Sequence, residues 1–64
     1  MKTYAITIQT ENAAFECQPG AEVARILRDL ADQCERLGVP RATTLHDING
    51  NRVGRAYIGR SKAI

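Results

Sequence analysis

The 64-residue chain contains no tryptophan, one phenylalanine, one histidine and two cysteines. It also lacks any apolar run near the roughly 20 residues that a membrane-spanning helix needs. Its start shows neither the long apolar region nor the cleavage site of a signal peptide. We therefore expect a cytoplasmic protein that does not contact a membrane. One histidine and two scattered cysteines do not make a metal-ligand set, so we expect no metal and no other cofactor.

The two cysteines, Cys17 and Cys34, are most simply explained as free thiols. They do not form a CxxC pair, and a chain without a secretion signal belongs to a compartment that keeps thiols reduced. Cys34 falls on the apolar stripe of a predicted helix, where a free cysteine acts as a small buried hydrophobe.

The size of the chain limits its stability. Its 64 residues allow one domain at most, and a domain of this size buries only about 60% of the surface that its unfolded chain exposes. A dimer or another partner would add buried surface. The composition, 44% hydrophobic and 25% charged residues, is typical of a soluble globular domain and argues against disorder.

The strongest pattern predicts one amphipathic helix over residues 21–37. Its apolar side chains recur every three or four positions and share one helical face: Val23, Ile26, Leu27, Leu30, Cys34 and Leu37. Pro19 and Gly20 precede this helix, and we take Gly20 as its N-cap. Gly38 suits the left-handed position after the last turn, and Pro40 prevents any continuation.

Two strands are predicted before the helix. Residues 2–10 alternate with the period of a half-buried strand, whose inward side chains are Tyr4, Ile6 and Ile8. After a turn at residues 11–13, residues 14–17 are predicted to form a short strand that returns antiparallel to the first. Phe15 is the expected aromatic anchor of this hairpin against the helix.

A second hairpin is predicted after the helix. Residues 43–48 and 52–58 are β-prone runs, and between them stands Asn49-Gly50, a strong hairpin signal. Gly54 lies inside the second run, which indicates a further bulge or a place where the helix approaches closely.

Two registers of this hairpin are open. A two-residue turn would pair Ile48 with Asn51. A type I turn followed by a left-handed glycine bulge would pair Asp47 with Asn51 and Leu45 with Val53. We prefer the second register, because it sets two apolar side chains opposite each other and leaves Asp47 free to cap the turn.

Together the elements follow the order ββαββ. We predict an α+β fold: a four-stranded antiparallel sheet made of two hairpins, with the single amphipathic helix packed on one face. The opposite face of the sheet is expected to stay open. The domain is predicted to span residues 1–58, and residues 59–64 to form a flexible basic tail.

No residue pattern indicates catalysis. His46 and Asp47 are neighbours, but adjacent residues of a strand point to opposite faces and so do not form an acid–base pair. The chain has no nucleophile elbow, phosphate-binding glycine loop or zinc-protease motif. A chain of this size also has little volume for a substrate pocket of about 300 Å³. We predict that the protein is not an enzyme and has no catalytic residues.

Charge is unevenly distributed along the chain. Residues 1–38 carry four basic and six acidic residues, whereas residues 39–64 carry five basic residues against Asp47 alone. The second hairpin and the tail supply the candidate contacts for a nucleic acid or another partner: Arg52, Arg55, Tyr57, Arg60 and Lys62. The net charge of only +2 and the pI of about 8.8 argue against a dedicated nucleic-acid-binding protein.

The polar face of the helix is predicted to be an ordinary solvated surface. It carries opposite charges four residues apart, each pair worth a few tenths of a kcal/mol. These pairs are Arg25–Asp29, Arg28–Asp32 and Asp32–Arg36.

Three segments form a distinctive combination: residues 12–16 (NAAFE), 22–31 (EVARILRDLA) and 47–54 (DINGNRVG). This combination resembles a group of short proteins encoded by proteobacterial phages, prophages and plasmids. The resemblance extends from Lys2 to Tyr57 and implies an accessory protein of a mobile element. It implies no particular catalytic or binding residues. The resembling proteins are more acidic near the end of the chain, where this sequence is basic.

The leading functional prediction is a small non-enzymatic module that binds another macromolecule. We expect a protein partner first, either a host protein, such as a defence component, or a second copy bound through a sheet edge or the open face. Small and polar residues on the outer face of the first strand favour edge pairing over a large hydrophobic interface. The alternative is a nucleic acid bound by the basic C-terminal hairpin and tail.

Overall fold

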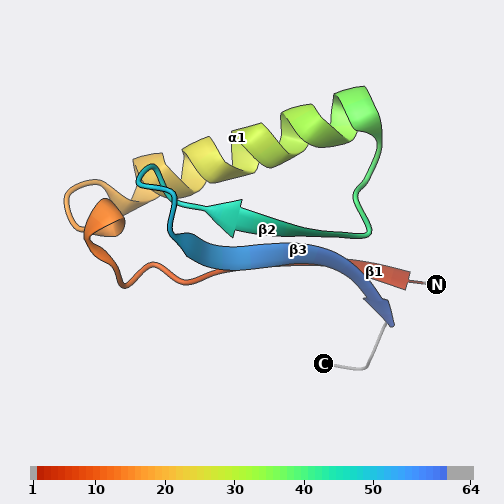
Figure 1. Ribbon diagram of the computed structural model, residues 1–64, viewed down its shortest axis with the longest axis horizontal. Helices are drawn as coiled ribbons and strands as arrows, with labels where there is room; N and C mark the ends of the chain where they lie inside the picture. The colour runs from red at the N-terminus through yellow and green to blue at the C-terminus, as the bar shows by residue number, and fades with distance from the viewer. Residues whose placement is uncertain (1, 61–64) are drawn as a thin grey trace.

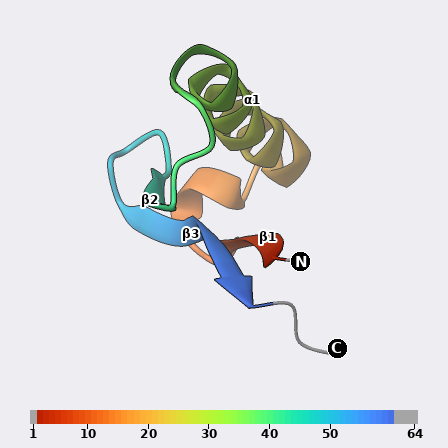
Figure 2. The same ribbon diagram turned by 90° about the vertical axis from the view of Figure 1, so that its right-hand side faces the viewer.

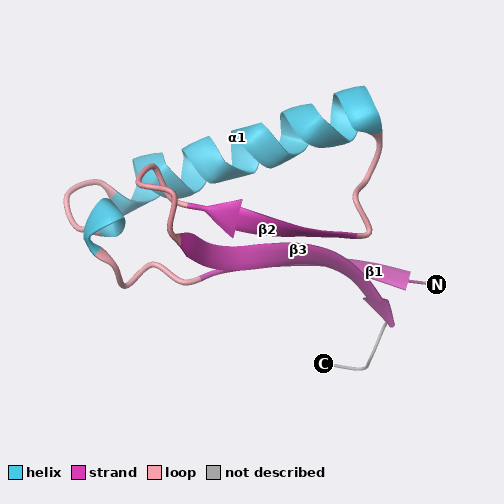
Figure 3. Ribbon diagram, in the orientation of Figure 1, coloured by secondary structure: helices cyan, strands magenta, loops and turns pink. Residues whose placement is uncertain are grey.

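The chain forms two layers, a three-stranded antiparallel sheet and one long helix across one of its faces (Figures 1 and 3). The computed structural model describes residues 2–60. Its elements are β1 (Lys2–Ile8), a 3-10 turn η1 (Ala13–Phe15), α1 (Pro19–Leu37), β2 (Ala42–His46) and β3 (Arg52–Arg60). The α+β class is therefore confirmed, whereas the four strands and the ββαββ order are not.

The strand order is β1-β3-β2, so the last strand lies in the middle of the sheet (Figure 2). β3 pairs with β1 along the whole of β1, from Lys2 opposite Arg60 to Ile8 opposite Gly54. It also forms the predicted hairpin with β2. β3 continues through Gly59 and Arg60, the first two residues of the predicted basic tail. Residues 61–64 lie outside the described part of the chain.

The predicted short strand at residues 14–17 is wrong. Asn12 caps η1 instead, because its side-chain oxygen accepts a hydrogen bond from the Ala14 backbone N–H at 3.0 Å. This turn places the Phe15 side chain in the core, where only 3% of its surface is exposed. The seven-residue β1 then pairs with the nine-residue β3, which offers far more ladder bonds than four residues could.

The helix begins two residues earlier than predicted. Gln18 is the N-cap in place of Gly20, and Pro19 occupies the first turn, where its missing N–H is no loss. At the other end Gly38 has a φ of +89°, as expected of a helix-ending glycine, and its N–H donates to the Cys34 carbonyl.

The core lies between α1, η1 and the helix-facing side of the sheet. Its buried apolar side chains are Phe15, Ile26, Leu30, Leu45, Val53 and Ala56. Cover is incomplete, since Ile6 and Ile58, on the same side of the sheet as Ala56, remain 43% and 38% exposed. Cys34 is only half-buried and Cys17 is exposed, and both are free thiols.

The preferred register of the second hairpin is confirmed at its turn. The Asp47 N–H donates to the Asn51 carbonyl at 2.9 Å, and Gly50 takes the left-handed conformation with φ +85°. Further along, Leu45 lies opposite Gly54 in place of Val53, because a bulge shifts the register between Leu45 and His46.

Gly54 marks the bulge and a close approach, but the approaching element is β1 and not the helix. A methyl group at this position would overlap the Thr7 carbonyl oxygen and lie 2.9 Å from its carbon. The absence of a side chain at Gly54 therefore lets β1 pack against the bulged part of β3.

Candidate functional site

Within residues 2–60, no helix or strand covers the sheet face opposite α1, and we refer to this face as the open face. Ala56 points toward the helix and has none of its surface exposed. Its neighbours on β3, Arg55 and Tyr57, therefore project from the open face, because side chains alternate along a strand. Arg55 stands between Thr7 of β1 and Thr44 of β2.

Tyr57 occupies the middle of the open face. The residues directly opposite it are Ala5 on β1 and Ala42 on β2, so its two cross-strand neighbours carry only methyl groups. The guanidinium carbon of Arg55 lies 5.0 Å from the centre of this ring, within the range of a cation–π contact. The pair forms a flat, cationic platform on the central strand.

A shallow hollow of about 580 Å³ adjoins this platform. Arg52 and Arg55 both line it, together with Thr7 and Thr44. The hollow exists where Gly54 contributes no side chain and the bulge bends β3. Beyond Arg52 lies a smaller depression of about 300 Å³, which Glu11 also lines.

The two faces of the molecule differ in charge. The ion pairs found within residues 2–60 all lie on α1 and join Arg25 to Glu22 and Asp29, and Arg36 to Asp32. The predicted Arg25–Asp29 and Asp32–Arg36 pairs are thus present. Arg52 and Arg55 take part in none of these ion pairs. In the described part of the chain, the strands that form the open face carry no carboxylate side chain.

Three of the five predicted contact residues therefore share one surface. Arg52, Arg55 and Tyr57 project from the open face, and the first two line the same hollow. Arg60 is the last residue of β3 and pairs with Lys2, which places its backbone at the far end of the sheet. Lys62 lies outside the described residues.

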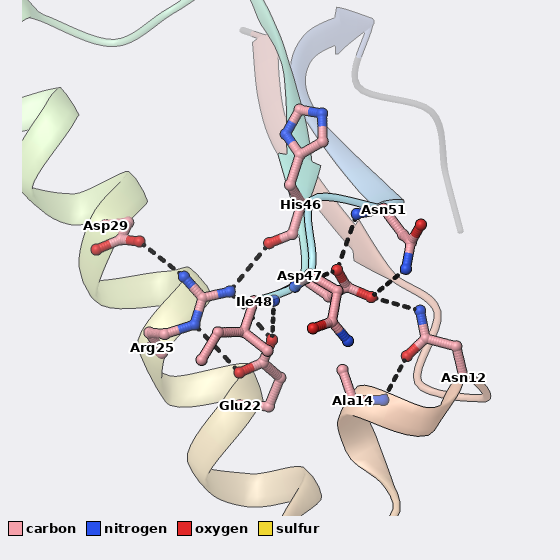
Figure 4. Close-up of polar contacts among 10 residues, drawn as sticks. Asn12, Ala14, Glu22, Arg25, Asp29, His46, Asp47, Ile48 and Asn51 are labelled. Atoms are coloured by element: carbon pink, nitrogen blue, oxygen red, sulfur yellow. Dashed lines mark hydrogen bonds and ion pairs between the residues drawn. The ribbon is translucent and has the colours of Figure 1, made fainter.

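The structure also contains a buried carboxylate pair that the sequence did not reveal as a unit (Figure 4). Asp47 is 4% exposed, and one of its oxygens accepts from the backbone N–H groups of Asn49 and Asn51 at 2.9 and 2.8 Å. Its other oxygen accepts from the side-chain amides of Asn12 and Asn51 at 2.7 and 3.2 Å. The capping role of Asp47 was predicted, whereas its bond to Asn12 was not.

Glu22 is the second member of the pair. It is 7% exposed, accepts the Ile48 N–H at 2.8 Å and is held by Arg25 at 3.0 and 3.1 Å. Arg25 also donates to the His46 carbonyl at 3.1 Å. This network ties the β2–β3 turn to the start of α1, and the Asn12 bond of Asp47 ties the same turn to η1.

Hydrogen bonds keep both carboxylates ionised. The side-chain bond from Arg25 lowers the pKa of Glu22, against an opposing effect of burial. Burial by itself would raise the pKa of Asp47, but the bonds from Asn51, Asn12 and Asn49 outweigh it and lower that pKa. Because their oxygens already accept these hydrogen bonds, we assign Glu22 and Asp47 a structural role: they hold the β2–β3 turn in place.

His46 does not join this network through its ring. Its side chain is exposed and points away from Asp47, and it is the His46 carbonyl oxygen that accepts the bond from Arg25 (Figure 4). The predicted separation of the two neighbouring side chains is thus confirmed. Among residues 2–60, no three His, Cys, Asp or Glu side chains are grouped so that they could hold a metal ion.

No family model matches the chain, and no curated protein or solved structure matches it either. The resemblance to proteins of phages, prophages and plasmids accordingly stays a prediction. In the part of the chain that the structure describes, no helix is both long and apolar enough to cross a membrane.

Proposed function

We propose that this protein is a small non-enzymatic binding module whose open face binds single-stranded nucleic acid. The observation that carries the proposal is the Arg55–Tyr57 platform in the middle of an uncovered sheet, with Arg52 beside it and no carboxylate on the strands around it. The cytoplasmic location expected from the sequence is part of this proposal.

The platform suits a single strand because each of its groups matches a part of a nucleotide. Every base has a flat face that stacks on an aromatic ring. The cross-strand neighbours of Tyr57, Ala5 and Ala42, have side chains too short to obstruct a base that approaches its ring. Arg52 and Arg55 supply the charges that phosphates require. Stacking on Tyr57 favours exposed bases over a duplex, in which base faces are covered.

The size of the open face limits how much it can hold. Five residue steps separate Arg52 from Tyr57, about 16 Å of strand. One copy would therefore hold a short segment with low affinity. Two arginines that each neutralise one phosphate predict a slope of about −1.4 for log K against log salt, from about −0.7 per phosphate in single strands.

The test is fluorescence anisotropy of labelled oligothymidine and oligouridine at several salt concentrations. Arg55→Gln should weaken binding about tenfold and make the salt slope about 0.7 less steep. Tyr57→Leu should weaken binding by roughly 5- to 150-fold at every salt concentration, since stacking on an aromatic ring contributes about 1–3 kcal/mol per base.

Arg28→Gln is the matched control. It removes the same charge from the exposed surface of α1, away from the open face. If Arg28→Gln weakened binding as much as Arg55→Gln, the attraction would be a general effect of net charge and the open face would not be the site. Failure of the unaltered protein to bind either oligonucleotide at 50 mM salt would reject the proposal.

A protein partner is the second candidate, and the exposed edges of β1 and β2 favour it. A phage-encoded modulator of a host defence component is one form of it, suggested by the resemblance alone. A pull-down of the tagged protein from bacterial lysate, with and without nuclease, separates the two candidates. Retention of one stoichiometric protein after nuclease treatment would favour this candidate over nucleic acid.

A further inference from the structure

β1 is an edge strand whose outer backbone groups are unpaired within the described chain. The Gln9 N–H donates to the Val53 carbonyl at 2.7 Å, so the backbone groups of Gln9 point toward β3. Direction alternates along a strand, and the N–H and C=O groups of Tyr4, Ile6 and Ile8 therefore point toward the free edge. Figure 2 shows β1 at the side of the sheet opposite β2.

Beyond its first residue, Lys2, β1 has none of the features that usually protect an edge. Its register with β3 is unbroken, and from Thr3 to Ile8 it contains no charge and no proline. The other edge strand, β2, is better protected. It has only five residues, its register with β3 is interrupted by the bulge between Leu45 and His46, and Pro40 and Arg41 stand just before it. An edge that is unbroken in register and uncharged over six residues is the kind that pairs with another strand.

The helix-facing side of β1 is also incompletely covered. Ile6 is 43% exposed although it lies on the same side of the sheet as the fully buried Ala56. Ile58, diagonal to Ile6 on the neighbouring strand, is 38% exposed. On β2, by contrast, the inward Leu45 is 6% exposed. The partly exposed apolar side chains thus lie on β1, the unprotected edge strand, and beside it on β3.

We propose that β1 pairs antiparallel with β1 of a second copy, about a two-fold axis at Ile6. In this register Ile6 lies opposite its own counterpart, and Tyr4 lies opposite Ile8. All three have outward backbone groups, so each pair can exchange two hydrogen bonds. The dimer has a six-stranded sheet in the order β2-β3-β1-β1-β3-β2.

A second copy fits this edge because β1 is complementary to itself. Around Ile6 the inward residues are apolar, and the outward residues, Thr3, Ala5 and Thr7, are small. Antiparallel pairing therefore sets apolar against apolar on the inward side, and Ala5 against Thr7 on the outward side. No charge of β1 meets a like charge, since Lys2 would face Thr10 of the other copy. The Ile6 side chains meet on the side where each lacks cover.

The dimer would also enlarge the open face. A two-fold axis perpendicular to the sheet keeps both helices on one side, so the two Arg55–Tyr57 platforms share the other side. A longer single strand could then contact both platforms at once, and its affinity would exceed that of a short segment bound to one platform. This last consequence rests on the proposed function, whereas the dimer does not.

The experiment is sedimentation equilibrium of the full chain without nucleic acid. The unaltered protein should have twice the monomer mass of 7.0 kDa. Ile6→Lys should halve the observed mass, because it places a charge on the inward side of the edge. Ile48→Lys is the matched control: Ile48 is 69% exposed in the β2–β3 turn, and its replacement should leave the mass unchanged.

A second measurement does not depend on a destabilising charge. In a Cys17→Ser/Cys34→Ser background, Ile6→Cys should form a disulfide-linked dimer under mild oxidation. Directly paired strand residues have Cα atoms about 5.5 Å apart, within the range of a disulfide. Thr44→Cys, on β2, should stay monomeric on a non-reducing gel.

The outcomes separate clearly. A monomeric mass for the unaltered protein at millimolar concentration would overturn the proposal, and so would a dimer that Ile6→Lys leaves intact or a link through Thr44→Cys alone. Arg55→Gln should change oligonucleotide binding without changing the mass. Failure of the dimer is thereby distinguished from failure of the nucleic-acid site.

Discussion

Replacing Gly54 by alanine tests the packing of β1 against the bulged strand. Among residues 2–60, the glycines with positive φ are Gly38 and Gly50, so Gly54 is not needed for its backbone conformation. It is needed for space, because a Cβ there would overlap the Thr7 carbonyl oxygen and lie 3.0 Å from the Ile8 Cα. These are backbone atoms, and β1 would have to move by about 1 Å or more to restore ordinary contact.

The expected loss follows from the hydrogen bonds at that point. The displacement would weaken the Gln9–Val53 bond of 2.7 Å and the neighbouring ladder bonds. Two or three such bonds, at about 0.5–1.5 kcal/mol each, give a loss of about 1–4 kcal/mol. A domain of this size has a total stability of about 3–10 kcal/mol. At about 4–8 °C per kcal/mol, Gly54→Ala should lower Tm by roughly 4–30 °C.

Thermal unfolding followed by circular dichroism measures the effect, and two other glycines provide controls. At Gly59, in the same strand, a Cβ would only touch the Tyr57 ring at 3.6 Å, and Gly59→Ala should change stability by less than about 0.5 kcal/mol. At Gly20, in α1, a Cβ meets nothing within 4 Å, and Gly20→Ala should stabilise by up to about 1 kcal/mol. A Gly54→Ala protein that melts within 2 °C of the unaltered chain would refute the close approach.

Two further predictions concern the interior. Glu22 and Asp47 have folded-state pKa values below their ordinary 4.5 and 3.8. Their contribution to stability is therefore complete above pH 5 and declines as the pH falls through the lowered values. Urea midpoints measured from pH 6 to pH 2 should decrease, and a Glu22→Gln/Asp47→Asn variant should show a weaker decrease; an equal slope would contradict the assignment. Phe15→Ala removes an aromatic side chain that is 3% exposed, at a cost of about 3–5 kcal/mol. Urea unfolding followed by circular dichroism should show this loss, and a free energy of unfolding within about 1 kcal/mol of the original would show that Phe15 is not in the core.

The candidate site could be predicted in part. The period of a strand places Arg55 and Tyr57 on one face, and their basic neighbourhood is visible in the composition of the C-terminal half. That alanines flank Tyr57 depends on the pairing of β3 with two other strands, which no local pattern contains. The burial of Glu22 was missed for the same reason, since its partner Ile48 lies 26 residues away.

The helix and the second hairpin could be derived from the sequence because the interactions that form them are local. The helix follows from a repeat of three to four residues and ends at Gly38, and the β2–β3 turn follows from Asp47 and Gly50, which bond within five residues. The partner of β1, by contrast, depends on contacts between residues far apart in the sequence. The short segment at residues 14–17 was the nearest candidate in sequence, but Asn12 stabilises a turn there and Phe15 is buried in the core. The ladder with β3 closes a long loop, whose entropic cost grows only slowly with its length, and it provides a full strand of hydrogen bonds in return.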